Sequence, residues 1–157
     1  MRSLGFLAVA ALFGGLAFLL ACQAGKDADA AWPDRESGGR PLLAQFEGRL
    51  PCRKPGCDKV KLGLAFYGVP RAERFQLAIV EVDGGDDRQL YQGELRWKRG
   101  VSGFQSAEVI LLSEDVPEAY RRWWQVSDEI LLAVDADFRP IAGNASWGSM
   151  LSRRIAD

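Results

Sequence analysis

The chain has 157 residues, and its 20 Lys and Arg residues nearly balance its 21 Asp and Glu residues. This balance favours neither a nucleic acid nor another polyanion as a partner. The chain contains no His, which excludes Ser-His-Asp and Cys-His catalytic arrangements, and we expect a protein that is not an enzyme.

The N-terminus has the pattern of an export signal. Arg2 precedes the uncharged stretch of residues 4–20, which contains three glycines. This stretch is shorter than the roughly 20 apolar residues that a membrane-spanning helix needs. At its end lies Leu19-Leu20-Ala21-Cys22, which resembles the lipobox of bacterial lipoproteins. The resemblance implies that residues 1–21 are a signal peptide and that Cys22 becomes the lipidated first residue of the mature chain. The alternative is an ordinary secretory signal that is cut near the same point.

The residues after Cys22 indicate where the anchor lies and how it joins the rest of the chain. Gln23 stands where lipoproteins of the inner membrane usually carry Asp, so in a Gram-negative host we expect the periplasmic face of the outer membrane. Residues 22–41 are rich in Ala, Gly, Asp and other polar residues, a composition that cannot build a core. We therefore expect a flexible tether over residues 22–41 and a single domain over residues 42–157.

From Leu43 onward, apolar residues alternate with polar or small residues in short runs that turn residues separate. Such runs predict β-strands. The expected strands cover residues 60–66, 75–79, 90–97, 107–112, 130–134 and 145–151, and a helical turn is expected over 115–124. We therefore predict an all-β fold, a small antiparallel meander closed into a barrel. Such a barrel either fills its interior with side chains or holds one small ligand, and the pattern leaves both open.

Two further cysteines, Cys52 and Cys57, flank a loop of four residues. In an oxidising envelope this pair predicts a structural disulfide. Two alternatives stay open: a thiolate pair that holds Cu(I), since soft sulfur ligands select this ion, and a redox sensor whose disulfide state reports on the envelope. A zinc site is disfavoured because four nitrogen or sulfur ligands cannot be assembled.

The segment Phe46-Glu47-Gly48-Arg49-Leu50-Pro51-Cys52, followed by Cys57 and an alternating strand, resembles the N-terminal domain of the NlpE family. The similarity continues over the late strand and turn at residues 124–141. That family comprises outer-membrane lipoproteins linked to copper homeostasis and envelope-stress signalling, and the resemblance implies a lipocalin-like barrel. The family usually spaces its cysteines by two residues. Here four intervene, but a turn centred on Pro55 and Gly56 can still bring the sulfurs together.

An aromatic and basic segment follows Val116 and contains Tyr120, Arg121, Trp123 and Trp124. At helical spacing its apolar side chains share one face, and we expect them to plug one end of the barrel. The alternative is a rim that binds a ligand or a partner, with Arg attracting a carboxylate or a lipid head group. On a strand, adjacent tryptophans would face opposite sides, and one of them would be exposed.

These observations predict a monomeric, lipid-anchored envelope protein that senses or binds rather than catalyses. The first hypothesis, taken from the NlpE resemblance, is a sensor or binding module for copper, redox or envelope stress, with Cu(I) as the candidate cofactor. The second is a lipocalin-like carrier of a small apolar ligand or lipid. The third is a structural or inhibitory lipoprotein that docks an envelope protein through the surface around Trp123 and Trp124.

Overall fold

The computed structural model describes residues 36–37, 39–52, 55–82, 88–144, 146 and 148–155. The predicted signal peptide, the lipidation site Cys22 and most of the predicted tether lie outside these residues. The strands are β1 (Glu36–Ser37), β2 (Arg40–Pro51), β3 (Lys59–Tyr67), β4 (Arg74–Val82), β5 (Arg88–Glu94), β6 (Arg96–Val101), β7 (Phe104–Leu111), β8 (Arg122–Ser127), β9 (Ile130–Ala133) and β10 (Met150–Arg153). Between β7 and β8 lies a 3-10 helix, η1 (Glu118–Tyr120).

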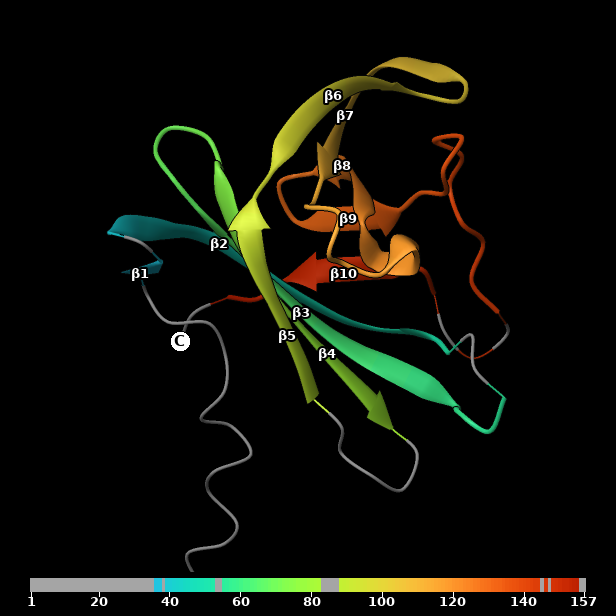
Figure 1. The fold of residues 1–157 in the computed structure, drawn as a ribbon. Coiled ribbons are helices and arrows are strands. Elements are labelled where there is room, and N and C mark those ends of the chain that lie inside the picture. The colour runs from blue at the N-terminus through green and yellow to red at the C-terminus, as the bar shows by residue number, and fades with distance from the viewer. Residues whose placement is uncertain are drawn as a thin grey trace, which may run out of the picture. The chain divides into compact units, whose positions relative to one another are not determined.

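All of these strands belong to one antiparallel sheet, in the order β5-β4-β3-β2-β10-β9-β8-β7-β6, with β1 paired to β2 off this path. Within β2 to β5, and within β6 to β10, each strand pairs with the next strand in the chain. The last strand, β10, also pairs with β2. This is an up-and-down meander in which the long strand β2 and the short last strand β10 lie side by side (Figure 1).

The two ends of the strand order, β5 and β6, are consecutive in the chain and are separated only by Leu95. The Leu95 N–H donates a hydrogen bond to the carbonyl oxygen of Glu73 at 3.0 Å. One long, bent strand therefore pairs with β4 through its first half and with β7 through its second half. Figure 1 shows β5 running upward into β6 across the fold. The sheet thus curls on itself, and the predicted all-β, antiparallel barrel-like fold is confirmed.

The helical turn predicted over residues 115–124 is wrong in extent. Pro117 has an extended backbone (φ −52°, ψ 136°), the helix is limited to η1, and β8 begins at Arg122. The tryptophans and Val126 have aromatic and β-branched side chains that suit a strand, and the segment pairs with β7 on one side and β9 on the other. Tertiary pairing therefore outweighs the helical spacing of the apolar residues.

Predicted strand boundaries also differ from the observed ones, most of all in two strands. The strand expected over residues 90–97 runs from Arg88 to Val101 with its bend at Leu95, because its two halves find different partners. The last strand, expected over residues 145–151, is β10, which begins at Met150 and is fixed by its register with β9.

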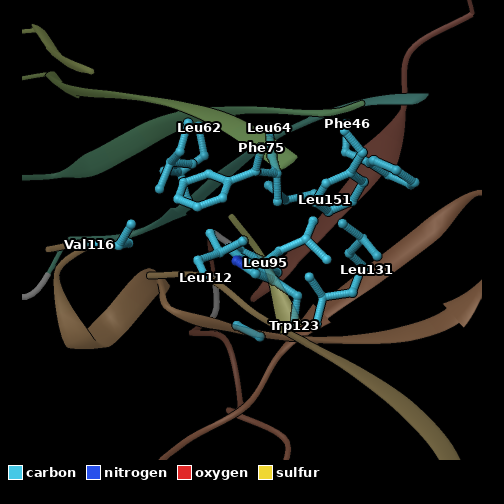
Figure 2. Packing of buried hydrophobic residues seen from close by; sticks show 14 of the residues in the cluster. Phe46, Leu62, Leu64, Phe75, Leu95, Leu112, Val116, Trp123, Leu131 and Leu151 are labelled. Atoms are coloured by element: carbon cyan, nitrogen blue, oxygen red, sulfur yellow. The ribbon is translucent and has the colours of Figure 1, made fainter. Parts of the chain in front are cut away.

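Side chains fill the inside of the curled sheet. The apolar residues Val60, Leu62, Leu64 and Phe66 of β3 belong to the inward cluster. Figure 2 shows Leu62 and Leu64, with Phe75 of β4, on one side of the interior and Leu131 and Trp123 on the other. The inward cluster comprises Phe46, Leu50, Val60, Leu62, Leu64, Phe66, Ala72, Phe75, Leu77, Ile79, Leu95, Ile110, Leu112, Val116, Trp123, Leu131, Ala133 and Leu151. Of the two interiors that the sequence left open, the described residues form the packed one.

A second, smaller apolar cluster lies outside the main core, on the half of the sheet that β6 to β9 form. It comprises Val101, Ala107, Val109 and Val134, with Leu111, Trp124 and Phe138 partly buried against it. The turn after β9 carries Phe138, whose carbonyl oxygen accepts a hydrogen bond from the Ser102 N–H at 2.9 Å. The Lys98 ammonium lies 3.6 Å from the centre of the Phe138 ring. This turn therefore covers part of the outer face and leaves the rest open.

Candidate binding surface and disulfide loop

Cys52 and Cys57 are joined by a disulfide, with their Cα atoms 5.5 Å apart. Cys52 directly follows β2, and Cys57 lies two residues before β3 begins. The bond therefore closes the loop just beyond Pro51 and Lys59, the last paired residues of the β2–β3 ladder. Gly56 has a φ of +84°, a left-handed conformation that glycine adopts without strain, and it lets the wider cysteine spacing close. Both cysteines are half-buried and pack against the core cluster, so the bond closes the β2–β3 loop next to the core.

The disulfide does not fit the Cu(I) hypothesis as it stands. Copper(I) binds thiolates, and neither sulfur of a disulfide is a thiolate. No group of three or more His, Cys, Asp or Glu side chains in the described part of the chain is arranged to hold a metal ion. The disulfide form therefore supports a structural or redox role for Cys52 and Cys57.

The two adjacent tryptophans lie on opposite faces of β8, as the period of a strand requires. Trp123 is fully buried in the core, and its indole N–H donates a hydrogen bond to the Tyr120 carbonyl oxygen at 2.8 Å. Trp124 points to the outer face, where its ring centre lies 5.0 Å from that of Phe104. Trp123 therefore belongs to the main core, whereas Trp124 is half-buried on the outer face against the smaller cluster.

The other residues of the predicted rim belong to the fold itself. Tyr120 packs against the core. The Arg121 guanidinium donates hydrogen bonds to the carbonyl oxygens of Glu114 and Val116 and forms a 2.9 Å ion pair with Glu118. Arg121 is thus committed to fixing the loop before β8, and the structure does not bring it together with Trp124 as a ligand-binding rim.

Glu118 lies at the centre of a small charge cluster. Its carboxylate accepts a hydrogen bond from Arg122 and also pairs with Arg121. The hydrogen bond from Arg122, followed by the positive charges of both arginines, holds the pKa of Glu118 below its ordinary value of 4.5, although desolvation acts in the opposite direction. The cluster fixes η1 against the start of β8.

An apolar row crosses the outer face of the sheet. Trp124 on β8 stands directly opposite Leu132 on β9, which in turn stands opposite Met150 on β10. We call these three residues, together with Phe104, Val126 and Ile130, the outer strip. Its members are exposed or half-buried, with 54% of Phe104 and 47% each of Val126 and Met150 accessible to solvent. A contiguous exposed apolar patch marks an interaction surface more often than scattered single residues do.

An open groove lies beside the outer strip, where β7 and β8 separate. The β7–β8 ladder ends at the pair Glu108 and Gln125. Beyond this pair, a groove of about 370 Å³ is lined by Phe104, Ser106, Ala107 and Glu108 on one side and by residues 124–128 on the other. The groove therefore joins the apolar rings of Phe104 and Trp124 to polar groups of both strands.

The carboxylate of Asp128 gives this groove its acidic character, since the carboxylate of Glu108 is already engaged by Arg71. Glu108 forms a 2.8 Å ion pair with Arg71, and Asp128 accepts a long hydrogen bond, 3.5 Å, from the Gln125 amide. None of the described residues that line the groove is Lys or Arg. The groove therefore favours a ligand that carries positive charge.

Of the outer strip, only Trp124 is predicted from the sequence as a binding residue, whereas Phe104, Val126, Ile130, Leu132 and Met150 are not. These residues come from four strands, and only the register of the sheet brings them together.

The chain matches no family model, no curated protein and no solved structure. Within the described residues, no helix has the length and apolar character that crossing a membrane requires.

Proposed function

We propose that the chain is a non-enzymatic binding module of the bacterial cell envelope that presents the outer strip to a protein partner. The observation that carries the proposal is the cross-strand row of Trp124, Leu132 and Met150, which remains partly open to solvent although the main core of the barrel is complete without it. Aromatic residues and Met are enriched in protein interfaces. The proposal corresponds to the docking hypothesis, with Trp124 retained and Trp123 assigned to the core.

The proposed cellular location of the module follows from the N-terminal sequence. Lipidation of Cys22, with Gln23 after it, would tether the domain to the periplasmic face of the outer membrane. The predicted tether ends at residue 41, but β1 begins at Glu36 and β2 at Arg40. The part of the tether before β1 would leave the domain free to orient its outer strip toward a partner, and the protein would act as a monomer.

The packed interior argues against the carrier alternative. A carrier needs room inside its barrel, whereas Trp123, Phe75 and neighbouring large side chains occupy that space without exposure. A role in carrying lipid would require these side chains to move apart, which a close-packed core resists.

Redox sensing is a second candidate function, and the Cys52–Cys57 disulfide favours it. The bond stands at the end of a hairpin and packs against the core, so its reduction would loosen the β2–β3 connection in a way that a partner could detect. This candidate retains the envelope-stress role that the NlpE resemblance implies, and Cu(I) would enter it only after reduction. Alkylation of the thiols in intact cells followed by mass measurement tests it: a pair that stays oxidised under copper and reductive stress alike contradicts the sensor.

Photo-crosslinking in the living envelope tests the docking function. A benzoyl-phenylalanine in place of Val126 samples the outer strip, and the same group in place of Leu90 samples an exposed apolar position on β5, 68% accessible, away from the strip. We expect one dominant protein adduct from position 126, its loss when Trp124→Ala is added, and no such adduct from position 90. Equal adducts from both positions, or none from position 126, would refute the proposal.

A further inference from the structure

The groove beside the outer strip has the features of a site for an added β-strand. We infer that it binds an extended segment of the partner protein, one in which apolar and basic residues alternate. This inference rests on the proposed function and specifies the chemistry of the partner. It is carried by three observations: the separation of β7 from β8, the apolar rings at the groove, and the Asp128 carboxylate.

The separation of the strands leaves part of β7 available for pairing. The described ladder between β7 and β8 ends at Glu108 and Gln125, while β8 continues with β9 up to the pair Ser127 and Ile130. Residues 104–107 belong to β7 but have no partner residue on β8. At about 3.3 Å per residue this segment is roughly 13 Å long, enough for a strand of about four residues. An open strand edge is a template for another strand.

The apolar side of the groove provides contacts for alternate side chains of such a strand. The Phe104 and Trp124 rings are 5.0 Å apart and tilted by 34°, and Val126 lies on the same lining. Successive side chains of a strand point to opposite faces, so every second residue of the bound segment would meet these three side chains. Apolar residues at these positions would bury surface that the free protein leaves exposed.

The charge of the groove selects the occupant. Asp128 lies on the lining with no Lys or Arg among the described lining residues, and Glu108 is already paired with Arg71, so a basic residue on the bound segment would pair with Asp128. A second copy of this chain, paired about a two-fold axis, would bring the Asp128 carboxylates of both copies to one interface. An anionic membrane surface would be repelled as well. Charge therefore favours a basic segment of a different protein.

A peptide probe tests this inference with the full chain purified in detergent. The probe is a soluble ten-residue peptide in which Val alternates with Lys, and the matched control alternates Val with Glu. We expect saturable binding of the Val-Lys peptide and binding of the Val-Glu peptide that is at least about tenfold weaker. Asp128→Asn and Phe104→Ala should each weaken binding several-fold, whereas Leu90→Ala should leave it unchanged.

Methylation of peptide nitrogens separates strand addition from simple charge attraction. Because the N–H groups of a strand point alternately to its two edges, methylating all Val amides and methylating all Lys amides must have opposite effects: one set abolishes binding and the other leaves it intact. Equal effects of the two sets, or no saturable binding of the Val-Lys peptide, would overturn the inference. A partner that crosslinks to position 126 while the peptide fails would leave the proposed function standing and remove only the strand-addition site.

Discussion

The adjacent residues Trp123 and Trp124 of strand β8 point to opposite faces of the sheet. Trp123 fills the core and satisfies its indole N–H on Tyr120, while Trp124 faces outward beside Phe104. The helical spacing of the segment predicted one shared face for these aromatics. The backbone pairs with two neighbouring strands instead, and a period of two then separates the tryptophans.

Alanine at each tryptophan should therefore affect different properties. Trp123→Ala should lower the free energy of unfolding by about 3–5 kcal/mol, because it empties a large core site. Trp124→Ala should lower it far less and should act on partner capture. Urea unfolding followed by far-ultraviolet circular dichroism measures both, and an equal loss in the two variants would contradict the assignment of faces.

The charge cluster around Glu118 predicts a specific dependence on pH. The pKa of Glu118 is lower in the folded state than its ordinary value of 4.5, so its ionised form stabilises the fold. This contribution is complete above pH 4.5 and is lost as the pH falls through the lower, folded pKa. The stability difference between the wild type and Glu118→Gln should thus disappear in acid. Glu129→Gln, which removes a charge without removing the Arg122 contact, serves as the control, and a difference that grows in acid would contradict the cluster's role.

At the scale of elements, the alternation in β3 and the cysteine loop were predictable, because each depends on neighbours in the sequence. The bend at Leu95 and the start of β8 were not, because both are set by which distant strand supplies hydrogen bonds. The bend at Leu95 could not be predicted because no Gly, Pro, Asn or Asp stands directly beside it in the sequence.

The closure between β2 and β10 depends on a close approach at Gly48. A Cβ at this position would lie 2.5 Å from the Met150 carbonyl oxygen and 2.8 Å from Leu151 Cδ2. Gly48→Ala should therefore destabilise the fold by about 1–3 kcal/mol and lower hydrogen-exchange protection in β10. Gly148→Ala is the matched control, since its Cβ would meet only the flexible Met150 side chain at 3.7 Å. If the two variants were equally stable, the close approach would have no energetic consequence.

The Cys52–Cys57 bond should stabilise its hairpin modestly. Its cysteines are five positions apart, and closing so short a loop removes little freedom from the unfolded chain, about 2 kcal/mol in the chain-entropy account. Replacing both cysteines by Ala should reduce stability by about this amount and leave a folded protein. Denaturant unfolding of the oxidised wild type and of the double variant checks this, and complete unfolding of the variant would show that the bond is essential to the fold.

At the scale of the whole molecule, the barrel and its disulfide followed from the sequence, but the candidate binding surface did not. Trp124 was recognisable as an aromatic of interest, yet its neighbours Leu132 and Met150 come from strands that only the curled sheet places beside it. The groove arises in the same way, because it exists where two ladders diverge. Residues that become neighbours only through the pairing of distant strands form no recognisable motif in the sequence.

The central claim is that the outer strip is the surface that binds the partner, and an equilibrium binding measurement tests it most directly. The partner captured by crosslinking is titrated against the wild-type chain, against Val126→Asp in the strip and against Leu90→Asp on β5, each verified as folded. The account predicts that Val126→Asp weakens binding at least about tenfold, because a charge enters the apolar contact, while Leu90→Asp stays within about twofold of the wild type. Equal affinities of the wild type and Val126→Asp, or a larger loss in Leu90→Asp, would contradict it.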